Sequence, residues 1–207
     1  MMRYTPTVIL QRVAALLCSV TLFVTAGCVM IPYETPEARN NIQRDLKLNP
    51  GDIQAVSETN WCALGYGTEP VCKMTQGLGV LTNKGLILSV YKNKTYKEIG
   101  RVTTEQVNCA KTVLGGDAEE LFTVFTQNFG VTLAPITPGG RLNVPAKIKF
   151  FNYLMSRGQP EFKGADGAFV RNTDRKRTVG GIVAGTSIAW HFQEEIWEGF
   201  NPCPVGA

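Results

Sequence analysis

The spacing of apolar residues predicts most of the elements in this chain of 207 residues. From residue 53 to residue 136, apolar side chains recur at every second position or in short runs, as in β-strands. Turn residues such as Asn, Gly and Asp separate these stretches. The expected strands are residues 53–61, 72–80, 86–91, 96–101, 107–113, 121–126 and 131–134. Seven short strands joined by tight turns predict a small antiparallel β-barrel or sandwich.

One segment after the strands has the period of an amphipathic helix. Val144-Pro145 opens it, because proline is favoured in the first helical turn, and Gly158 closes it. Residues three and four apart then fall on one apolar face. This face consists of Ile148, Phe151, Leu154 and Met155, with Phe150 at its edge. We expect the helix to cap the open end of the barrel.

A short helix is also expected before the strands. Thr35 is a helix-capping residue and Pro36 suits the first helical position. Ala38, Ile42 and Leu46 then lie on one face, and Pro50-Gly51 ends the segment.

Near the C-terminus, apolar residues recur at every fourth position, and acidic residues lie between them. The apolar positions are Ile188, Phe192, Ile196 and Phe200, with Trp190 and Trp197 beside them. This spacing predicts a C-terminal amphipathic helix. We expect it to pack on the barrel, because its aromatic side chains would otherwise form a large apolar patch in water.

The N-terminus has the form of a secretory signal peptide. Arg3 and Arg12 precede an apolar run from Val13 to Val24, and the small residues Ala26-Gly27 follow it. A helix of this run spans only about 18 Å, short of the ~30 Å hydrocarbon core of a bilayer. The run therefore predicts export rather than a stable membrane span.

The residues Val24-Thr25-Ala26-Gly27-Cys28 resemble the lipobox of bacterial lipoproteins. The resemblance implies cleavage before Cys28 and acylation of both its sulfur and its new amino group. Because Val29 rather than Asp follows, it also implies an outer-membrane location facing the periplasm. Two or three acyl chains hold a protein durably at a membrane. The alternative is an ordinary secretory signal in which Cys28 has no special role.

These segments divide the chain into four parts. Residues 1–27 are the expected signal peptide, and residues 28–51 are the lipidated cysteine, a tether and the short helix. Residues 52–158 are the barrel-like domain with its capping helix, and residues 159–207 are a C-terminal extension with the amphipathic helix packed on the barrel. The predicted fold class is α+β.

Four cysteines besides Cys28 remain in the exported part of the chain. An even number in an exported protein predicts two disulfides, and four cysteines allow three pairings. We favour Cys62–Cys72, which flanks a short loop rich in Gly and Pro. The second bond would then be Cys109–Cys203, which fixes the C-terminal extension to the body of the domain.

The order of strands, turns and helix resembles the pleckstrin-homology-like superfold, including its GRAM-type members. The resemblance covers residues 53–157. It is carried by residues 79–88, 96–99 and 121–126 with Gly130, and by the helix from Pro145. It implies that the domain binds lipid headgroups, peptides or proteins rather than performing catalysis. No cofactor and no metal are expected.

Basic residues gather on two successive turns of the expected sheet. They are Lys84, Lys92, Lys94 and Lys97, with Tyr91 and Tyr96 beside the second turn. In pleckstrin-homology-like domains, basic residues on early hairpins often hold anionic headgroups. The resemblance therefore implies binding of an anionic envelope lipid or another small envelope ligand. The alternative is a solvated hairpin tip whose lysines discourage aggregation.

The only histidine, His191, precedes Glu194 and Glu195 by three and four residues. On a helix these side chains would be neighbours, as in a metal half-site or an acid–base pair. Metal sites usually need three or four ligands, and the sequence has no second histidine. We therefore expect no enzymatic activity, and an enzyme using His191 is the second alternative.

The charge balance argues against one class of partner. The chain carries 21 basic and 17 acidic side chains, and Arg3 and Arg12 leave with the signal peptide. A nucleic-acid-binding domain normally shows a basic stripe, so we expect no nucleic-acid partner. The sequence thus predicts a lipid-anchored binding or scaffolding module of the cell envelope. Its expected partners are the membrane, through the anchor, and another envelope protein.

Overall fold

The computed structural model describes residues 31–112, 121–163 and 169–204. The predicted signal peptide and Cys28 lie outside these residues, so both stay predictions. The described elements are α2 (Pro36–Asp45), β1 (Ile53–Gly65), β2 (Thr75–Thr82), β3 (Gly85–Lys92), β4 (Thr95–Val102), β5 (Cys109–Thr112), β6 (Phe122–Phe125), β7 (Phe129–Ile136), α3 (Val144–Leu154), β8 (Glu161–Lys163), β9 (Val170–Ile182) and β10 (Ala189–Gly199).

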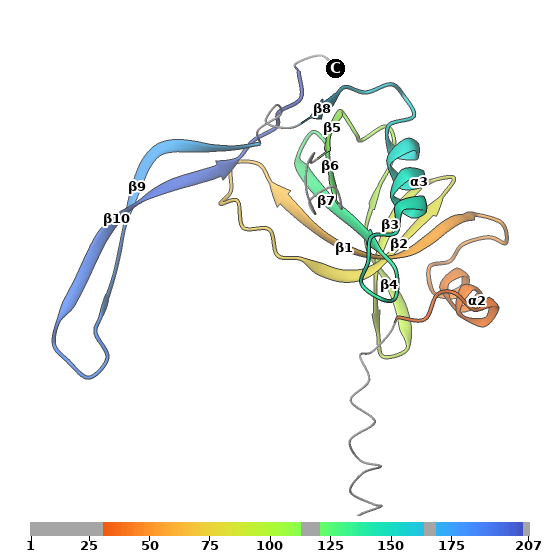
Figure 1. Cartoon of the computed structure of the whole chain (residues 1–207), viewed down its shortest axis with the longest axis horizontal. Helices are drawn as coiled ribbons and strands as arrows, with labels where there is room; N and C mark the ends of the chain where they lie inside the picture. The colour runs from red at the N-terminus through yellow and green to blue at the C-terminus, as the bar shows by residue number, and fades with distance from the viewer. Residues whose placement is uncertain (1–30, 113–120, 164–168, 205–207) are drawn as a thin grey trace, which may run out of the picture. The chain divides into compact units, whose positions relative to one another are not determined.

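Eight strands form one sheet in the order β4-β3-β2-β1-β7-β6-β5-β8 (Figure 1). Strands β1 to β7 overlap the seven predicted segments, although β2 begins at Thr75 rather than at residue 72, and β8 is an addition that pairs parallel with β5. Strand β1 joins the two halves, because residues 53–61 pair with β2 and residues 58–65 pair with β7. Of the expected β-barrel or sandwich, the structure shows a mostly-sheet core that is not a closed barrel, since β4 and β8 are edge strands of the described sheet.

Most residues of strands β2 and β3 are buried on both faces, which explains why apolar residues follow one another in Leu86–Leu88 instead of alternating with polar ones. Leu86 and Leu88 belong to a core cluster that includes α3, whereas Ile87 belongs to a second cluster that includes α2. Successive side chains of a strand point to opposite faces, so the two helices cover opposite faces of this half of the sheet. The fold is therefore α+β with a mostly sheet core.

Helix α2 confirms the predicted short helix. The Thr35 hydroxyl accepts a hydrogen bond from the Ala38 N–H at 3.1 Å, as an N-cap should. At its other end, Asp45 Oδ2 accepts from the backbone N–H of Tyr96 at 3.1 Å, which occupies a donor on edge strand β4. Tyr33 and Ile42 are buried in the cluster beneath it. Residues 31–51 are thus part of the folded domain rather than a spacer.

Helix α3 confirms the predicted capping helix, but it is rotated from the predicted orientation. Asn143 caps it, and the buried residues are Ala146, Phe150 and Leu154. Ile148, predicted for the apolar face, is 52% exposed. The Phe150 ring lies where a side chain at position 79 would be, since a Cβ on Gly79 would come within 2.7 Å of it. Gly79 therefore selects the face that packs.

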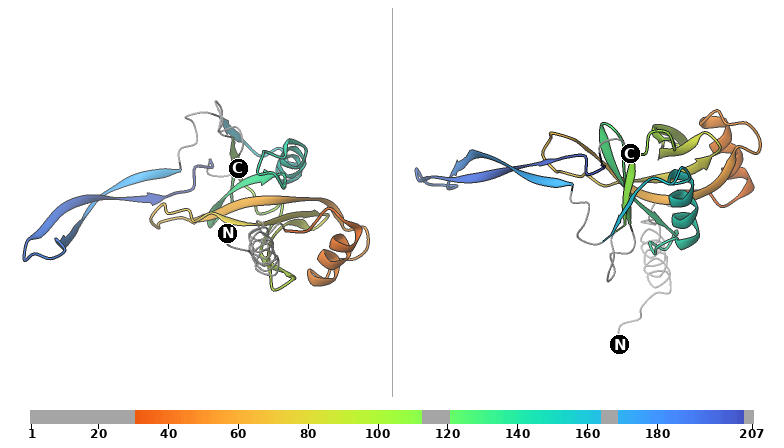
Figure 2. Two further views of the ribbon diagram at one scale, coloured as in Figure 1. Left: turned by 60° about the horizontal axis from the view of Figure 1, so that its bottom comes forward. Right: turned by 90° about the horizontal axis from the view of Figure 1, so that it is seen from above.

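The prediction of a C-terminal amphipathic helix is wrong. Residues 170–199 form an antiparallel hairpin of β9 and β10, which extends away from the large sheet (Figures 1 and 2). The apolar residues Ile188, Trp190 and Phe192 also alternate with Ala189 and His191, so the segment satisfies a period of two as well as a spacing of four. When both periods fit a segment, β-branched and aromatic residues favour the strand over the helix.

Both favoured disulfides are confirmed. Cys62–Cys72 has a Cα–Cα distance of 5.5 Å and Cys109–Cys203 one of 5.6 Å. The hairpin base is also held by hydrogen bonds from the Gly67 N–H to the Gly199 carbonyl at 2.8 Å and from the Gly199 N–H to the Thr68 carbonyl at 3.0 Å. The extension is therefore fastened at its base, as predicted, although not through a helix.

Tyr96 gives the domain a predicted weakness in alkali. Its hydroxyl donates to the Pro32 carbonyl, and burial raises its pKa from 10.0 to about 12. The folded state prefers the neutral phenol, so this contribution to stability is complete below pH 10 and is lost as the pH rises towards 12. We expect Tyr96→Phe to lower the free energy of unfolding at pH 7 by about 1 kcal/mol. The variant should then lose less stability than the native protein between pH 9 and pH 11, measured by urea unfolding; an equal loss would contradict the assignment.

Candidate functional site

The structure separates the basic residues that the sequence grouped together. Lys84 lies in the β2–β3 turn, whereas Lys92, Lys94 and Lys97 lie around the β3–β4 turn. These turns are at opposite ends of β3, roughly 25 Å apart at about 3.3 Å per residue. Lys84 therefore cannot share a small ligand with the other three.

The two tyrosines of the predicted ligand site belong to the domain's own packing. Tyr96 is 2% exposed and lies in the cluster beneath α2, and the centroid of the Tyr91 ring is 4.7 Å from that of Tyr96. Since the Tyr96 hydroxyl donates to Pro32, it has no free proton for a headgroup. The exposed part of the predicted site is reduced to Lys92, Lys94 and Lys97.

His191 lies on a strand, which removes the geometry that suggested chemistry. It is exposed on β10, opposite Gly180. Along a strand, Glu194 falls on the other face and Glu195 lies about 13 Å away, so neither is a helical neighbour. Within the described parts of the chain, no group of three or more His, Cys, Asp or Glu side chains could hold a metal ion.

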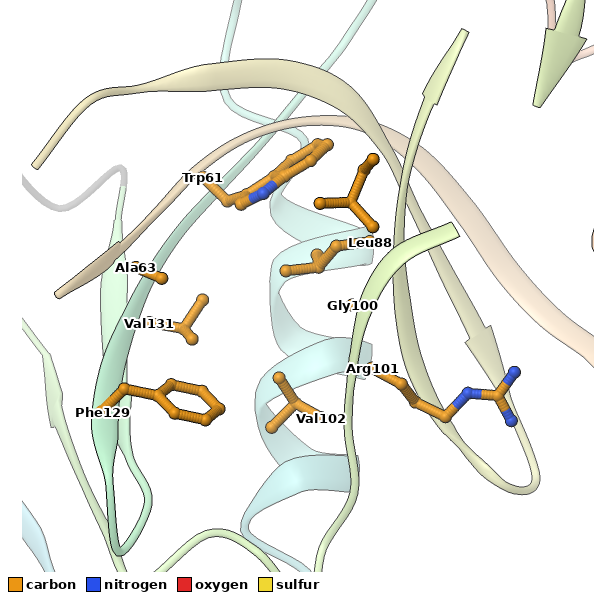
Figure 3. Close-up of a pocket in the computed structure, with 9 residues that line it drawn as sticks. Trp61, Ala63, Leu88, Gly100, Arg101, Val102, Phe129 and Val131 are labelled. Carbon is orange, nitrogen blue, oxygen red and sulfur yellow. The ribbon is translucent and has the colours of Figure 1, made fainter. Parts of the chain in front are cut away.

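An apolar pocket of about 210 Å³ opens between edge strand β4 and strands β1 and β7 (Figure 3). Its lining residues are Trp61, Ala63, Leu88, Ile99, Gly100, Arg101, Val102, Phe129 and Val131. Figure 3 shows the Arg101 guanidinium pointing away from the pocket. It pairs with Glu98 at 2.9 Å. The pocket offers apolar contact rather than reacting groups.

A second cavity of about 280 Å³ lies beside the Cys62–Cys72 bond. Its lining residues are Cys62, Leu64, Tyr66, Pro70, Cys72, Leu121, Thr123, Phe125, Gly130, Thr132, Phe169 and Val170, and none of them is charged. The hydroxyls of Thr123 and Thr132 bond each other at 2.9 Å, and the Tyr66 hydroxyl donates to the Thr126 carbonyl at 3.1 Å. These polar groups satisfy one another, so this cavity also lacks a reactive centre.

The hairpin of residues 170–199, which we call the arm, has a charged base. Strand β9 supplies basic residues and β10 supplies acidic ones. Arg171 pairs with Glu198 at 2.7 Å, and Arg177 Nε pairs with Glu194 at 2.9 Å. Arg177 also pairs with Glu69 of the disulfide loop, and its bonds to Glu194 and Glu69 raise its pKa. These pairs bring opposite charges together across the hairpin and onto the adjacent loop.

The outer half of the arm, residues 178–192, has the opposite character. It contains no Lys, Arg, Asp or Glu. Its large apolar side chains are 44–70% exposed, namely Ile182, Val183, Ile188, Trp190 and Phe192. The Trp190 and Phe192 rings stack with centroids 5.5 Å apart, and Gly181 lies against the Trp190 ring. Figure 2 shows this outer half extending beyond the large sheet in both views. We call the five exposed apolar residues Ile182, Val183, Ile188, Trp190 and Phe192 the apolar tip.

The aromatic residues of the arm stand out in the sequence, but their arrangement on a hairpin was not predicted. The missed signals are Gly185-Thr186-Ser187, which forms the hairpin turn, and the opposite charges of residues 171–177 and 194–198. The pocket residues Trp61, Ile99 and Phe129 had no distinctive signal, because alternation alone does not tell a pocket wall from a packed face.

Comparison with known proteins gives no further guide to the site. No protein-family model matches the chain, and no curated protein matches it significantly. None of the helices among the described residues has the length and apolar character needed to cross a bilayer.

Proposed function

We propose that this chain is a non-enzymatic module of the cell envelope, held at the membrane by a lipid on Cys28, that binds protein through its arm. The observation that carries the proposal is the apolar tip. Five large apolar side chains stand in water on the outer half of a hairpin whose base is held against the disulfide loop. Ile188, Trp190 and Phe192 alternate with Ala189 and His191 and so lie on one face of the hairpin, and an exposed apolar patch of this kind is typical of an interaction site.

The energetics of the arm support the same function. A two-stranded hairpin is marginally stable on its own in water, and three or more strands or a packed face are needed for independent stability. In the outer part of the arm, residues 178–182 of β9 and residues 189–193 of β10 form strand pairs only with one another among the described residues. A bound partner would supply both the missing strand neighbours and the apolar cover.

The body of the domain supports binding rather than catalysis. The order β4-β3-β2-β1-β7-β6-β5, followed by α3 against the sheet, agrees with the pleckstrin-homology-like resemblance. Members of that superfold bind headgroups, peptides or proteins. In this role the large sheet is a rigid base. Cys109–Cys203 ties the segment that follows the arm to β5, and Cys62–Cys72 holds the loop against which the base of the arm is bonded.

The tip can be tested by removing its aromatic rings. We expect Trp190→Ser combined with Phe192→Ser to reduce binding of a hydrophobic dye and to abolish recovery of protein partners from envelope fractions. The matched control is Ile99→Ser, which removes a 62% exposed apolar side chain from the rim of the first pocket. If both variants lose partners equally, or neither does, the arm is not the binding surface.

The anchor has its own test. We expect Cys28→Ala to release the protein from the membrane fraction, because the acyl chains are the proposed means of attachment. Mass spectrometry of the native protein should show an acylated N-terminal Cys28. A mature native chain that begins at another residue and carries no lipid would refute the anchor.

A further inference from the structure

We propose that the partner of the arm is the arm of another copy of this chain, with β10 of one copy beside β9 of the next. This inference rests on the proposed function and names the partner of the same surface. Pairing between copies would extend the two-stranded hairpin into a continuous antiparallel sheet in which all apolar tips point the same way.

The ladder between β9 and β10 shows which backbone groups are free. The Val183 N–H donates to the Ile188 carbonyl at 3.0 Å, which makes these two residues a hydrogen-bonded pair. In an antiparallel ladder such pairs alternate with pairs whose N–H and C=O groups point outward. The outward residues are therefore 176, 178, 180 and 182 on β9, and 189, 191, 193 and 195 on β10. Two long edges are thus ready to accept another strand.

The charges select which edges meet. Strand β9 carries four basic residues and one acidic residue, namely Arg171, Arg175, Lys176, Arg177 and Asp174, and β10 carries Glu194, Glu195 and Glu198. Pairing β9 with β9, or β10 with β10, sets like charges along a shared edge, which is destabilising. Pairing β10 with the β9 of a neighbour sets acidic residues beside basic ones. The arrangement is therefore head-to-tail rather than two-fold symmetric.

The apolar residues select the direction. From the turn to the base, β10 reads aromatic and then acidic, and β9 reads apolar and then basic. When the arms lie side by side in the register of the hairpin itself, Lys176 of one copy is beside Glu195 of the next, and the apolar tips form one band. Arms that point in opposite directions would bring a tip against a charged base. A head-to-tail contact repeats, so the product is a closed ring or an open row.

Proline caps on the two edges test the inference. Thr178→Pro and Gln193→Pro each remove an outward N–H while leaving the inward ladder bonds in place. Both lose the same hydrogen bond, from Gln193 Nε2 to the Thr178 hydroxyl at 2.8 Å, so they are matched. The native full chain in detergent, with its disulfides intact, should form species larger than a dimer by analytical ultracentrifugation. Each variant alone should be a monomer, and an equal mixture should give a one-to-one dimer and nothing larger.

Exchanging the charges at positions 176 and 195 is an independent test that leaves the backbone unchanged. Lys176→Glu and Glu195→Lys should each shift the native protein towards monomer, and the double variant should recover the large species because the two positions still match. Unchanged near-ultraviolet circular dichroism from the Trp190–Phe192 stack shows that the arm remains formed. A native protein that stays monomeric at every soluble concentration, or variant mixtures that never form the dimer, would overturn the inference. In that case a separate experiment decides whether the proposed function stands. It asks whether the arm captures a different protein or lipid vesicles.

Discussion

Replacement of Phe150 by alanine is expected to lower the free energy of unfolding by about 3–5 kcal/mol, the range for removing a fully buried aromatic ring. Phe150 is completely buried in the core cluster that joins α3 to the sheet. Its ring lies over Gly79, so the cavity left behind would open directly onto β2. Urea unfolding of the full chain measures the change, and an unchanged slope with denaturant would show that the unfolding transition remains the same.

Ile148→Ala is the matched control for this prediction. The apolar period of the sequence places Ile148 on the buried face, whereas the structure leaves it 52% exposed. Its removal should change the free energy of unfolding by no more than about 0.5 kcal/mol, as for an ordinary surface substitution. A large loss from Ile148→Ala together with a small loss from Phe150→Ala would mean that α3 packs through the face that the sequence favoured.

Removal of the Cys109–Cys203 bond is the second large effect. The bond closes a loop with a sequence separation of 94, which is worth about 4–5 kcal/mol in the chain-entropy model. The double variant Cys109→Ala with Cys203→Ala avoids a free thiol. At ~2–4 °C per kcal/mol for a domain of this size, it should melt about 8–20 °C lower.

The other disulfide provides the comparison. Cys62–Cys72 closes a loop with a separation of only 10, for which the same model gives about 3 kcal/mol. The double variant Cys62→Ala with Cys72→Ala should therefore lose less stability than the first. Equal losses, or the reverse order, would show that strain or residual structure in the unfolded chain matters more than loop length.

The strands of the large sheet were predictable because one physical signal dominates each of them. Residues 86–89 are buried on both faces, so this stretch is apolar apart from Ser89, and turn residues fix both ends of the strand. The cysteine pairing was predictable from loop composition and position. The closure of the sheet was not predictable, since it depends on how far the sheet curves around β1, and no local pattern encodes that curvature.

The arm shows where sequence patterns become ambiguous. A spacing of four residues is an even number, so Ile188, Phe192 and Ile196 satisfy both a helix and a strand. The deciding information lay in β9, about twenty residues away, whose basic residues match the acidic residues of β10. For the same reason the alternative in which His191 acts with Glu194 or Glu195 loses its geometry, because it depended on the helix. The basic ligand site was divided because two turns adjacent in sequence lie at opposite ends of β3.

The most direct test of the arm as a protein-binding surface is photo-crosslinking in intact cells. A photoreactive amino acid would replace Phe192 in the apolar tip, and in a parallel strain it would replace Ile99 at the rim of the first pocket. We predict a strong covalent protein adduct from position 192 and none of comparable yield from position 99. Equal yields at the two positions, or no protein adduct from position 192, would contradict the account.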